Sequence, residues 1–199
     1  LPLPASPAGE PPAATFGDVF ANFPPPLPLQ PWAAQLKAAR KEQHSKDNPD
    51  AHCLPLGNMQ LHTHPEPRKI VQTTGLIVIL YEANGGVRQI FLDGRAHPAN
   101  WFPNWMGHSV GKWEGDTLVI DTVGFNDKTW LDPGGHVHSD QMHTIERFTR
   151  LSENQLKYEF VIDDPVMYTK PSLSILPISP RVNTPGAMCA SAVFCGSPS

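Results

Sequence analysis

The feature that most constrains the fold is a series of apolar segments with a period of two between residues 69 and 164. Alternation at this period is typical of β-strands, whose successive side chains point to opposite faces. The first segments are KIVQTT, LIVILYE and VRQIFLD, and NGG at residues 84–86 is a strong hairpin signal between the last two. The sequence therefore predicts strands from the start of this region.

Two more hairpins follow along the chain. SVGKWEGDTLVIDTVGF predicts one with its turn at Glu114-Gly115, and MHTIERFTRL, SEN and QLKYEFVIDD predict another. The sequence shows no alternation of strands with helices and no repeat of fixed period. Seven or eight strands joined in this way favour an all-β fold, namely an antiparallel barrel or sandwich of calycin-like type.

Prolines suggest the limits of this domain. The sequence has 23 prolines, of which ten lie in residues 1–31 and four in residues 171–187. Because proline fixes φ and removes a hydrogen-bond donor, both ends favour extended paths. We expect three parts: a proline-rich docking arm with one or two short helices (1–46), an antiparallel β domain (47–171) and a proline-containing C-terminal tail (172–199).

The arm carries an apolar stripe at the spacing of one helix face. Its members are Phe16, Val19, Phe20 and Phe23. A helix of two turns is unstable alone in water, so the stripe must pack on something. We expect it, together with Trp32, to enter a groove on another protein, although docking on the chain's own domain is the alternative. Pro31 is placed to begin a second helix.

Charge and hydropathy exclude some classes of protein. A net charge of −4 leaves no basic footprint for nucleic acid, and no apolar run is long enough to span a membrane. The first residues, LPLPASPAGE, resemble the end left after removal of a signal peptide, which indicates a periplasmic or extracellular protein. In that compartment a disulfide from Cys53 to Cys195 or Cys189 would tie the tail to the domain, and three free thiols are the alternative.

Four segments carry a resemblance to known proteins: NPDAHCLPLG, KIVQTTGLIVILYE, VGKWEGDTLVIDTVGFNDKTWLD and DDPVMYTKP. In these segments the chain resembles a group of secreted bacterial proteins, abundant in soil bacteria, for which no activity is established. The resemblance covers roughly residues 47–171. It implies an extracytoplasmic protein and supplies no site residues.

Histidines are the main candidates for metal ligands, and GGHVHSDQMH holds three of them. On a strand, His136 and His138 would share one face, and His143 or His108 could complete a site for copper or zinc. The pair formed by His62 and His64 offers a second such arrangement. Glycines 134 and 135 indicate a loop instead, where the histidines need bind nothing. No cofactor is the first expectation, with copper or zinc as the alternative.

Two further groups have both a functional and a structural interpretation. Asp121, Glu146 and His138 could serve acid–base chemistry, or could be outward residues of half-solvated strands. The aromatic residues of the loops could line a pocket or seal a barrel end: Trp101, Phe102, Trp105 and Trp130. No serine-nucleophile motif, dinucleotide fingerprint or phosphate-binding loop occurs in the sequence.

These observations favour a non-catalytic, extracytoplasmic accessory subunit. It would dock through its extended arm onto other protein subunits of a larger assembly, such as one at a membrane surface. One alternative is a secreted metal-dependent enzyme that uses the histidines on polysaccharide or aromatic substrates. Another is a small-ligand carrier of calycin type, which would have an apolar cavity inside its barrel.

Overall fold

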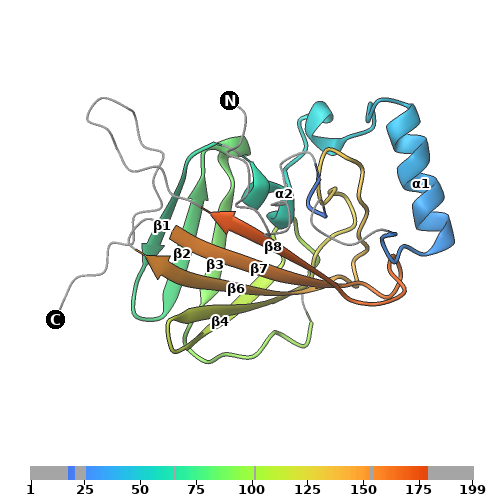
Figure 1. Ribbon diagram of the computed structural model, residues 1–199. Coiled ribbons are helices and arrows are strands. Elements are labelled where there is room, and N and C mark those ends of the chain that lie inside the picture. Colours follow the sequence, from blue (N-terminus) through green and yellow to red (C-terminus); the bar gives the residue numbers. More distant parts are fainter. Residues whose placement is uncertain (1–17, 21–25, 65, 101, 153–154, 179–199) are drawn as a thin grey trace.

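A single sheet that curls into a half-barrel forms most of the molecule (Figure 1). The computed structural model describes residues 18–20, 26–64, 66–100, 102–152 and 155–178. Its eight strands lie side by side in the order of the chain, from β1 to β8. The predicted all-β fold is confirmed.

The strands coincide closely with the predicted apolar segments. They are β1 (Arg68–Gln72), β2 (Leu76–Tyr81), β3 (Val87–Phe91), β4 (His108–Glu114), β5 (Thr117–Val123), β6 (His143–Ser152), β7 (Gln155–Asp163) and β8 (Ser172–Ile178). Six of the seven pairings are antiparallel, and β3 pairs with β4 in parallel. A parallel pair needs a connection of about a dozen residues or more, and the long loop at residues 92–107 provides it. The sheet is therefore mixed, whereas the sequence predicted antiparallel pairing throughout.

The helices are few and short. They are α1 (Pro31–Glu42) and α2 (Asn58–Thr63), with 3-10 turns η1 (Pro49–His52) and η2 (Ala83–Gly85). The predicted helix start at Pro31 is confirmed, since proline lacks the N–H that would be unpaired at that position. The helix expected around Val19 and Phe20 differs from the structure, in which residues 18–20 form a bridge and a turn. Phe16 and Phe23 lie outside the described residues.

The last strand was not expected from the sequence, which suggested an extended tail from residue 172. Instead β8 pairs with β7 along its length, from Ser172 opposite Ile162 to Ile178 opposite Leu156. Pro177 lies within this strand. In the described sheet β8 is an edge strand, paired on one side only, and proline is tolerated in such a strand.

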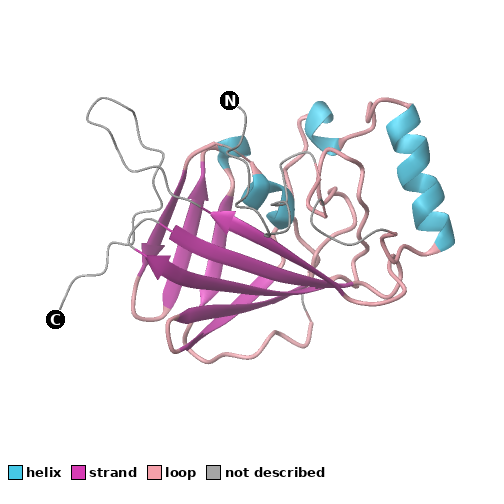
Figure 2. Ribbon diagram, in the orientation of Figure 1, coloured by secondary structure: helices cyan, strands magenta, loops and turns pink. Residues whose placement is uncertain are grey.

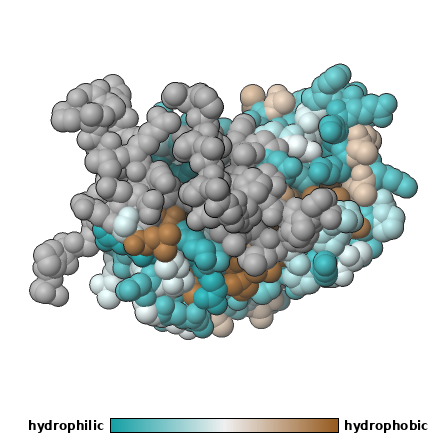
Figure 3. Space-filling view, in the orientation of Figure 1, coloured by the Kyte–Doolittle hydropathy of each residue, from teal (hydrophilic) through white to brown (hydrophobic). Residues whose placement is uncertain are grey.

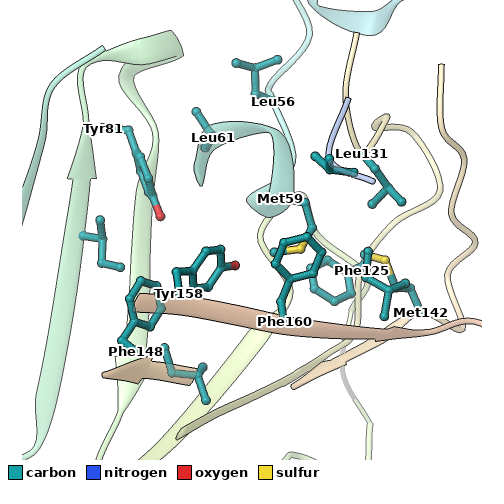
Figure 4. Packing of buried hydrophobic residues seen from close by; sticks show 14 of the residues in the cluster. Leu56, Met59, Leu61, Tyr81, Phe125, Leu131, Met142, Phe148, Tyr158 and Phe160 are labelled. Atoms are coloured by element: carbon teal, nitrogen blue, oxygen red, sulfur yellow. The ribbon is translucent and has the colours of Figure 1, made fainter. Parts of the chain in front are cut away.

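The core fills the concave side of the sheet, where α2 packs against the strands (Figure 4). Residues 58–62 of α2 are all buried. Leu61 lies close to the backbone of Gly86, where a Cβ atom would approach Leu61 Cδ1 to 2.7 Å. A larger residue at this point would force the Leu61 side chain to shift. Thus α2 acts as a plug of the half-barrel.

Loops collect between the sheet and α1, so the molecule has a regular end and an irregular end (Figure 2). Hydrophilic side chains dominate the coloured surface around α1, and apolar residues form smaller patches (Figure 3). Within the part of the chain that the structure describes, no helix combines the length and apolarity needed to cross a bilayer.

Candidate metal centre

Three polar residues from neighbouring strands lie on the outer face of the sheet, away from the core. His108 begins β4, Asp121 lies in β5 and His143 begins β6. The next residue in sequence after each of them is buried: Ser109, Thr122 and Thr144. These three are cross-strand partners on the core side. Since successive strand residues alternate between faces, the polar trio lies together on the other side.

A fourth residue, His97, joins the group from the loop between β3 and β4. Its Nε2 lies 3.0 Å from Oδ1 of Asp121, and Nε2 of His143 lies 2.8 Å from the same oxygen. The side chains of His97, Asp121 and His143 are 19%, 40% and 40% exposed. Two imidazoles therefore meet one carboxylate oxygen at a position that solvent reaches. We call His97, Asp121, His143 and His108 the outer cluster.

His108 contacts His97 on the opposite side of its ring, with 2.9 Å between the two Nδ1 atoms. Phe91 stacks on His108 at 5.4 Å between ring centroids, and Arg95 lies 3.9 Å above Phe91. Burial lowers the pKa of His108, and the nearby His97 and Arg95 lower it further. A neutral His108 has a lone pair that can accept a hydrogen bond from Nδ1 of His97. With the proton on Nδ1, Nε2 of His97 would give up its hydrogen bond to Asp121 and become the atom able to bind a metal.

The outer cluster has the donor set of a three-ligand metal site. Two histidines and one carboxylate, with a fourth position left for water or substrate, hold zinc in several hydrolases. In a tetrahedral site with bonds of about 2.0–2.1 Å, donor atoms are about 3.3–3.4 Å apart. The observed contacts of 2.8 and 3.0 Å are slightly shorter. Asp121 Oδ1 lies between the two nitrogens, and the donor atoms of the three residues do not all fall within 4.8 Å of one another. To hold an ion, the rings of His97 and His143 would have to turn toward each other.

The core side of the same strands carries a different polar group, centred on Arg88 and Glu146. Both side chains are essentially fully buried, and Arg88 donates to both carboxylate oxygens of Glu146. Tyr158 donates to Glu146 at 2.6 Å. Further hydrogen bonds join this pair to Ser109, Thr122, His62 and Asn58. We call these residues the inner network.

In the inner network, burial opposes the effect of a neighbouring charge on the pKa of both Glu146 and His62. Burial would raise the pKa of Glu146, but the positive charge and hydrogen bonds of Arg88 outweigh it and lower that pKa to about 2. Burial lowers the pKa of His62 to about 3, against the opposing effect of Glu146. Glu146 is thus ionised and His62 neutral over the usual pH range. A paired, enclosed group of this kind stabilises one packing arrangement and offers no access to a substrate.

The loop at residues 124–142 holds the other two histidines that the sequence predicts as metal ligands. His136 bonds to Asp132 through Nδ1 at 2.7 Å, and both side chains are buried. His138 instead bonds to Thr129 at 2.6 Å and to the carbonyl of Ser139. Burial lowers the pKa of His138, although the bond to the Ser139 carbonyl opposes the shift.

The structure therefore divides the four histidines predicted to share a metal. His108 and His143 belong to the outer cluster, whereas His136 and His138 have separate partners in the loop. His62 joins the inner network, and His64 pairs with Glu66. Asp121 and Glu146, considered together for acid–base chemistry, lie on opposite faces of neighbouring strands: Asp121 pairs with Ile145, the residue before Glu146.

The residues of the arm that the sequence predicts to contact a partner differ in their exposure to solvent. Val19 and Phe20 are buried by the chain itself, whereas Trp32 is 46% exposed. Cys53 is exposed, and Cys195 lies outside the described residues, so their disulfide stays a prediction. Of the loop aromatics, Trp130 is buried, in keeping with a plug, while Phe102 is 92% exposed.

His97 and the role of Asp121 as the common partner were missed in the sequence. One signal was present: positions 108, 121 and 143 each precede a residue that fits the core face of its strand. Aligning the three strands on their buried positions would have placed the trio on one face. Nothing in the sequence indicated how the long loop would bring His97 back to it.

A pocket of about 550 Å³ opens at the hairpin end of the sheet. Its lining includes Trp113, Phe148, Leu156 and Arg150. The pocket lies toward the core side, because Phe148 and Leu156 are buried core-facing residues. Its position is distinct from that of the outer cluster, which faces the other way.

Comparisons with known proteins did not extend this description. Neither a scan against protein-family models nor searches of curated proteins and of solved structures found a match to the chain.

Proposed function

We propose that this chain is a secreted metal-dependent enzyme that binds zinc or copper through His97, Asp121 and His143. The observation that carries the proposal is the meeting of two imidazole nitrogens on one oxygen of Asp121 at a solvent-accessible position. Structural zinc sites are closed by four protein ligands, whereas catalytic sites keep a position open. Zinc would support hydrolysis through an activated water, and copper would support oxidation.

Exposed aromatic residues of the loop that carries His97 favour a substrate that stacks on aromatic rings, such as a polysaccharide or an aromatic compound. The loop that carries His97 also carries Phe102, which is 92% exposed, and Trp105, which is partly exposed. Exposed aromatic rings provide apolar contact area with little loss of conformational entropy on binding.

Metal binding by the full chain tests the proposal. Protein purified without chelators is expected to contain zinc or copper, and calorimetric titration of the apoprotein should show binding that His143→Ala and His97→Ala weaken by about 10-fold or more. His52→Ala, which removes an exposed histidine elsewhere, should leave the titration unchanged. If the two cluster variants bind both ions as the original chain does, the proposal is wrong.

A second candidate, the small-ligand carrier, has support from the pocket beside Trp113 and Phe148. The interior beyond it is filled by the inner network, so any ligand would lie at the mouth of the half-barrel. Titration with an apolar fluorescent probe, repeated on Trp113→Ala, distinguishes this candidate, because the outer cluster lies elsewhere. A third proposal is that the chain is an accessory subunit, for which the exposed Trp32 would contact the partner protein.

A further inference from the structure

A second group of potential ligands lies where the N-terminal segment meets the loop at residues 124–142. One oxygen of Asp132 lies 2.7 Å from Nδ1 of His136, and Oδ1 of Asp18 lies 3.9 Å from the same nitrogen. The ligand atoms of all three residues fall within 4.8 Å of one another. Asp132 and His136 are buried, while the side chain of Asp18 is 48% exposed. An ion could therefore reach the group from the side of Asp18.

The charges at this place are unbalanced. Two carboxylates face one imidazole, and within the described ranges neither Asp18 nor Asp132 forms an ion pair with a lysine or arginine. Arg40 contacts the same loop, but its guanidinium group donates to the carbonyl of Gly135 and lies over the ring of Trp130. A buried carboxylate without a balancing charge is costly. A divalent cation would remove that cost.

The His136 ring can supply the third ligand. Its Nε2 is buried and has no hydrogen-bond partner among the described residues. No hydrogen bond from the described residues therefore fixes the ring in one tautomer on that side, and the proton can move to Nε2 when Nδ1 binds an ion. Two carboxylates and one imidazole suit ions such as Mn²⁺ and Zn²⁺.

We infer that Asp18, Asp132 and His136 form a cation site that fastens the N-terminal segment to the β domain. The segment already contacts the site: the Val19 amide donates to Asp132 at 2.8 Å, and the Phe20 ring packs edge-on against His136 at 4.9 Å. An ion bound to all three ligands joins the segment directly to the loop. Without the ion, the segment keeps the Val19 hydrogen bond to Asp132, the bridge at residue 18 and the ring contacts of the buried Phe20, among other contacts.

The site has a consequence for the arm. Val19 and Phe20 are the two described members of the apolar stripe that the sequence predicts to contact a partner. While they are fastened, both are buried by the chain's own domain. Residues 28–30 are attached separately, through backbone contacts of Pro28 and Gln30 with Thr169 and Met167. Among the described residues, the cation would therefore act on residues 18–20 and leave the attachment of residues 28–30 unchanged.

Hydrogen exchange of the Val19 and Phe20 amides tests this inference. The full chain carrying His97→Ala and His143→Ala is used, so that binding at the outer cluster does not contribute. With Mn²⁺ or Zn²⁺ at about 100 times its dissociation constant, exchange through local opening should slow about 100-fold. Asp18→Asn should abolish the slowing and keep the rate of the ion-free protein.

Asp140→Asn, which changes an exposed carboxylate in the same loop, is the matched control and should retain the full effect. The inference is overturned if neither ion slows exchange of these amides, or if the ion protects the Asp18→Asn protein equally. Because the outer cluster is disabled in every sample, the result does not depend on the proposed enzymatic site.

Discussion

At the residue scale, the decisive feature is that adjacent residues of one strand belong to different polar groups on opposite faces of the sheet. Asp121 faces outward and meets two histidines, while Thr122 faces inward and bonds to Arg88. The same alternation separates His143 from Thr144 in β6. The strands β4, β5 and β6 thereby contribute residues to two polar groups with opposite properties, one accessible and one enclosed.

His108 is proposed as a positioning residue that fixes the ring of His97. Substituting phenylalanine keeps an aromatic ring against Phe91 but removes the hydrogen-bond acceptor. In the Asp18→Asn background, which removes the second proposed cation site, we expect His108→Phe to weaken metal binding at the outer cluster by about 10–100-fold, as loss of a residue that orients a ligand typically does, while one ion still binds. Calorimetric affinity and stoichiometry measure both quantities. Loss of stoichiometric binding, or an unchanged affinity, would contradict this role.

At the scale of elements, the parallel pairing of β3 with β4 creates the outer cluster. The connecting loop must return to the start of β4, and Gly107 makes the final turn with φ of 66°. A Cβ atom there would lie 2.9 Å from the Val123 carbonyl and 2.7 Å from Thr122 Cγ2. This glycine is required both by its conformation and by its close approach to β5.

Gly107→Ala is therefore expected to destabilise the fold by about 1–3 kcal/mol, through backbone strain and displacement of the neighbouring strand. It should also weaken metal binding, because His108 is the next residue. Gly115→Ala is the matched control: Gly115 has a similar φ of 60°, but nothing lies within 4 Å of the added atom. Urea unfolding should show a larger loss for Gly107→Ala, and equal losses would refute the steric part of the explanation.

Elements with strong local signals were predictable, and contacts between distant segments were not. The hairpins joining β2 to β3, β4 to β5 and β6 to β7 follow from alternation and turn residues. The start of α1 follows from Pro31. By contrast, α2 is too short to show a helical period, and β8 contains a proline that favours an edge or a tail equally. The outer cluster depends on the path of a long loop, which local patterns do not specify.

At the scale of the whole molecule, the inner network joins the plug formed by α2 to the sheet. His62 and Asn58 come from α2, and Arg88 and Glu146 come from β3 and β6. Breaking this network would leave a buried charge without a partner, which is more costly than losing an exposed pair. The stability of the fold should therefore depend on the ionisation of these residues.

Acid is expected to destabilise the protein in two stages. The folded protein keeps His62 neutral down to a pKa of about 3, while the unfolded chain takes up this proton below about 6.5. Stability should thus fall as pH decreases from 6.5 toward 3. Glu146, whose pKa is lowered to about 2 from 4.5, adds a loss between those values. Both effects have the same sign.

The contribution of His62 is measured from urea unfolding at pH 7, 6 and 5. His62→Asn should be less stable at pH 7 but should show a smaller fall in unfolding free energy toward pH 5. His44→Asn, at an exposed position with positive φ that asparagine tolerates, should keep the original slope. An unchanged slope in His62→Asn would show that other groups cause the acid sensitivity.

Anomalous diffraction from crystals of the full chain loaded with Zn²⁺, with a parallel Cu²⁺ sample, tests the metal centre most directly. We expect a peak about 2.0–2.2 Å from Nε2 of His97, Nε2 of His143 and a carboxylate oxygen of Asp121, with His108 hydrogen-bonded to the far side of the His97 ring. A density map with both ions absent from this position would contradict it.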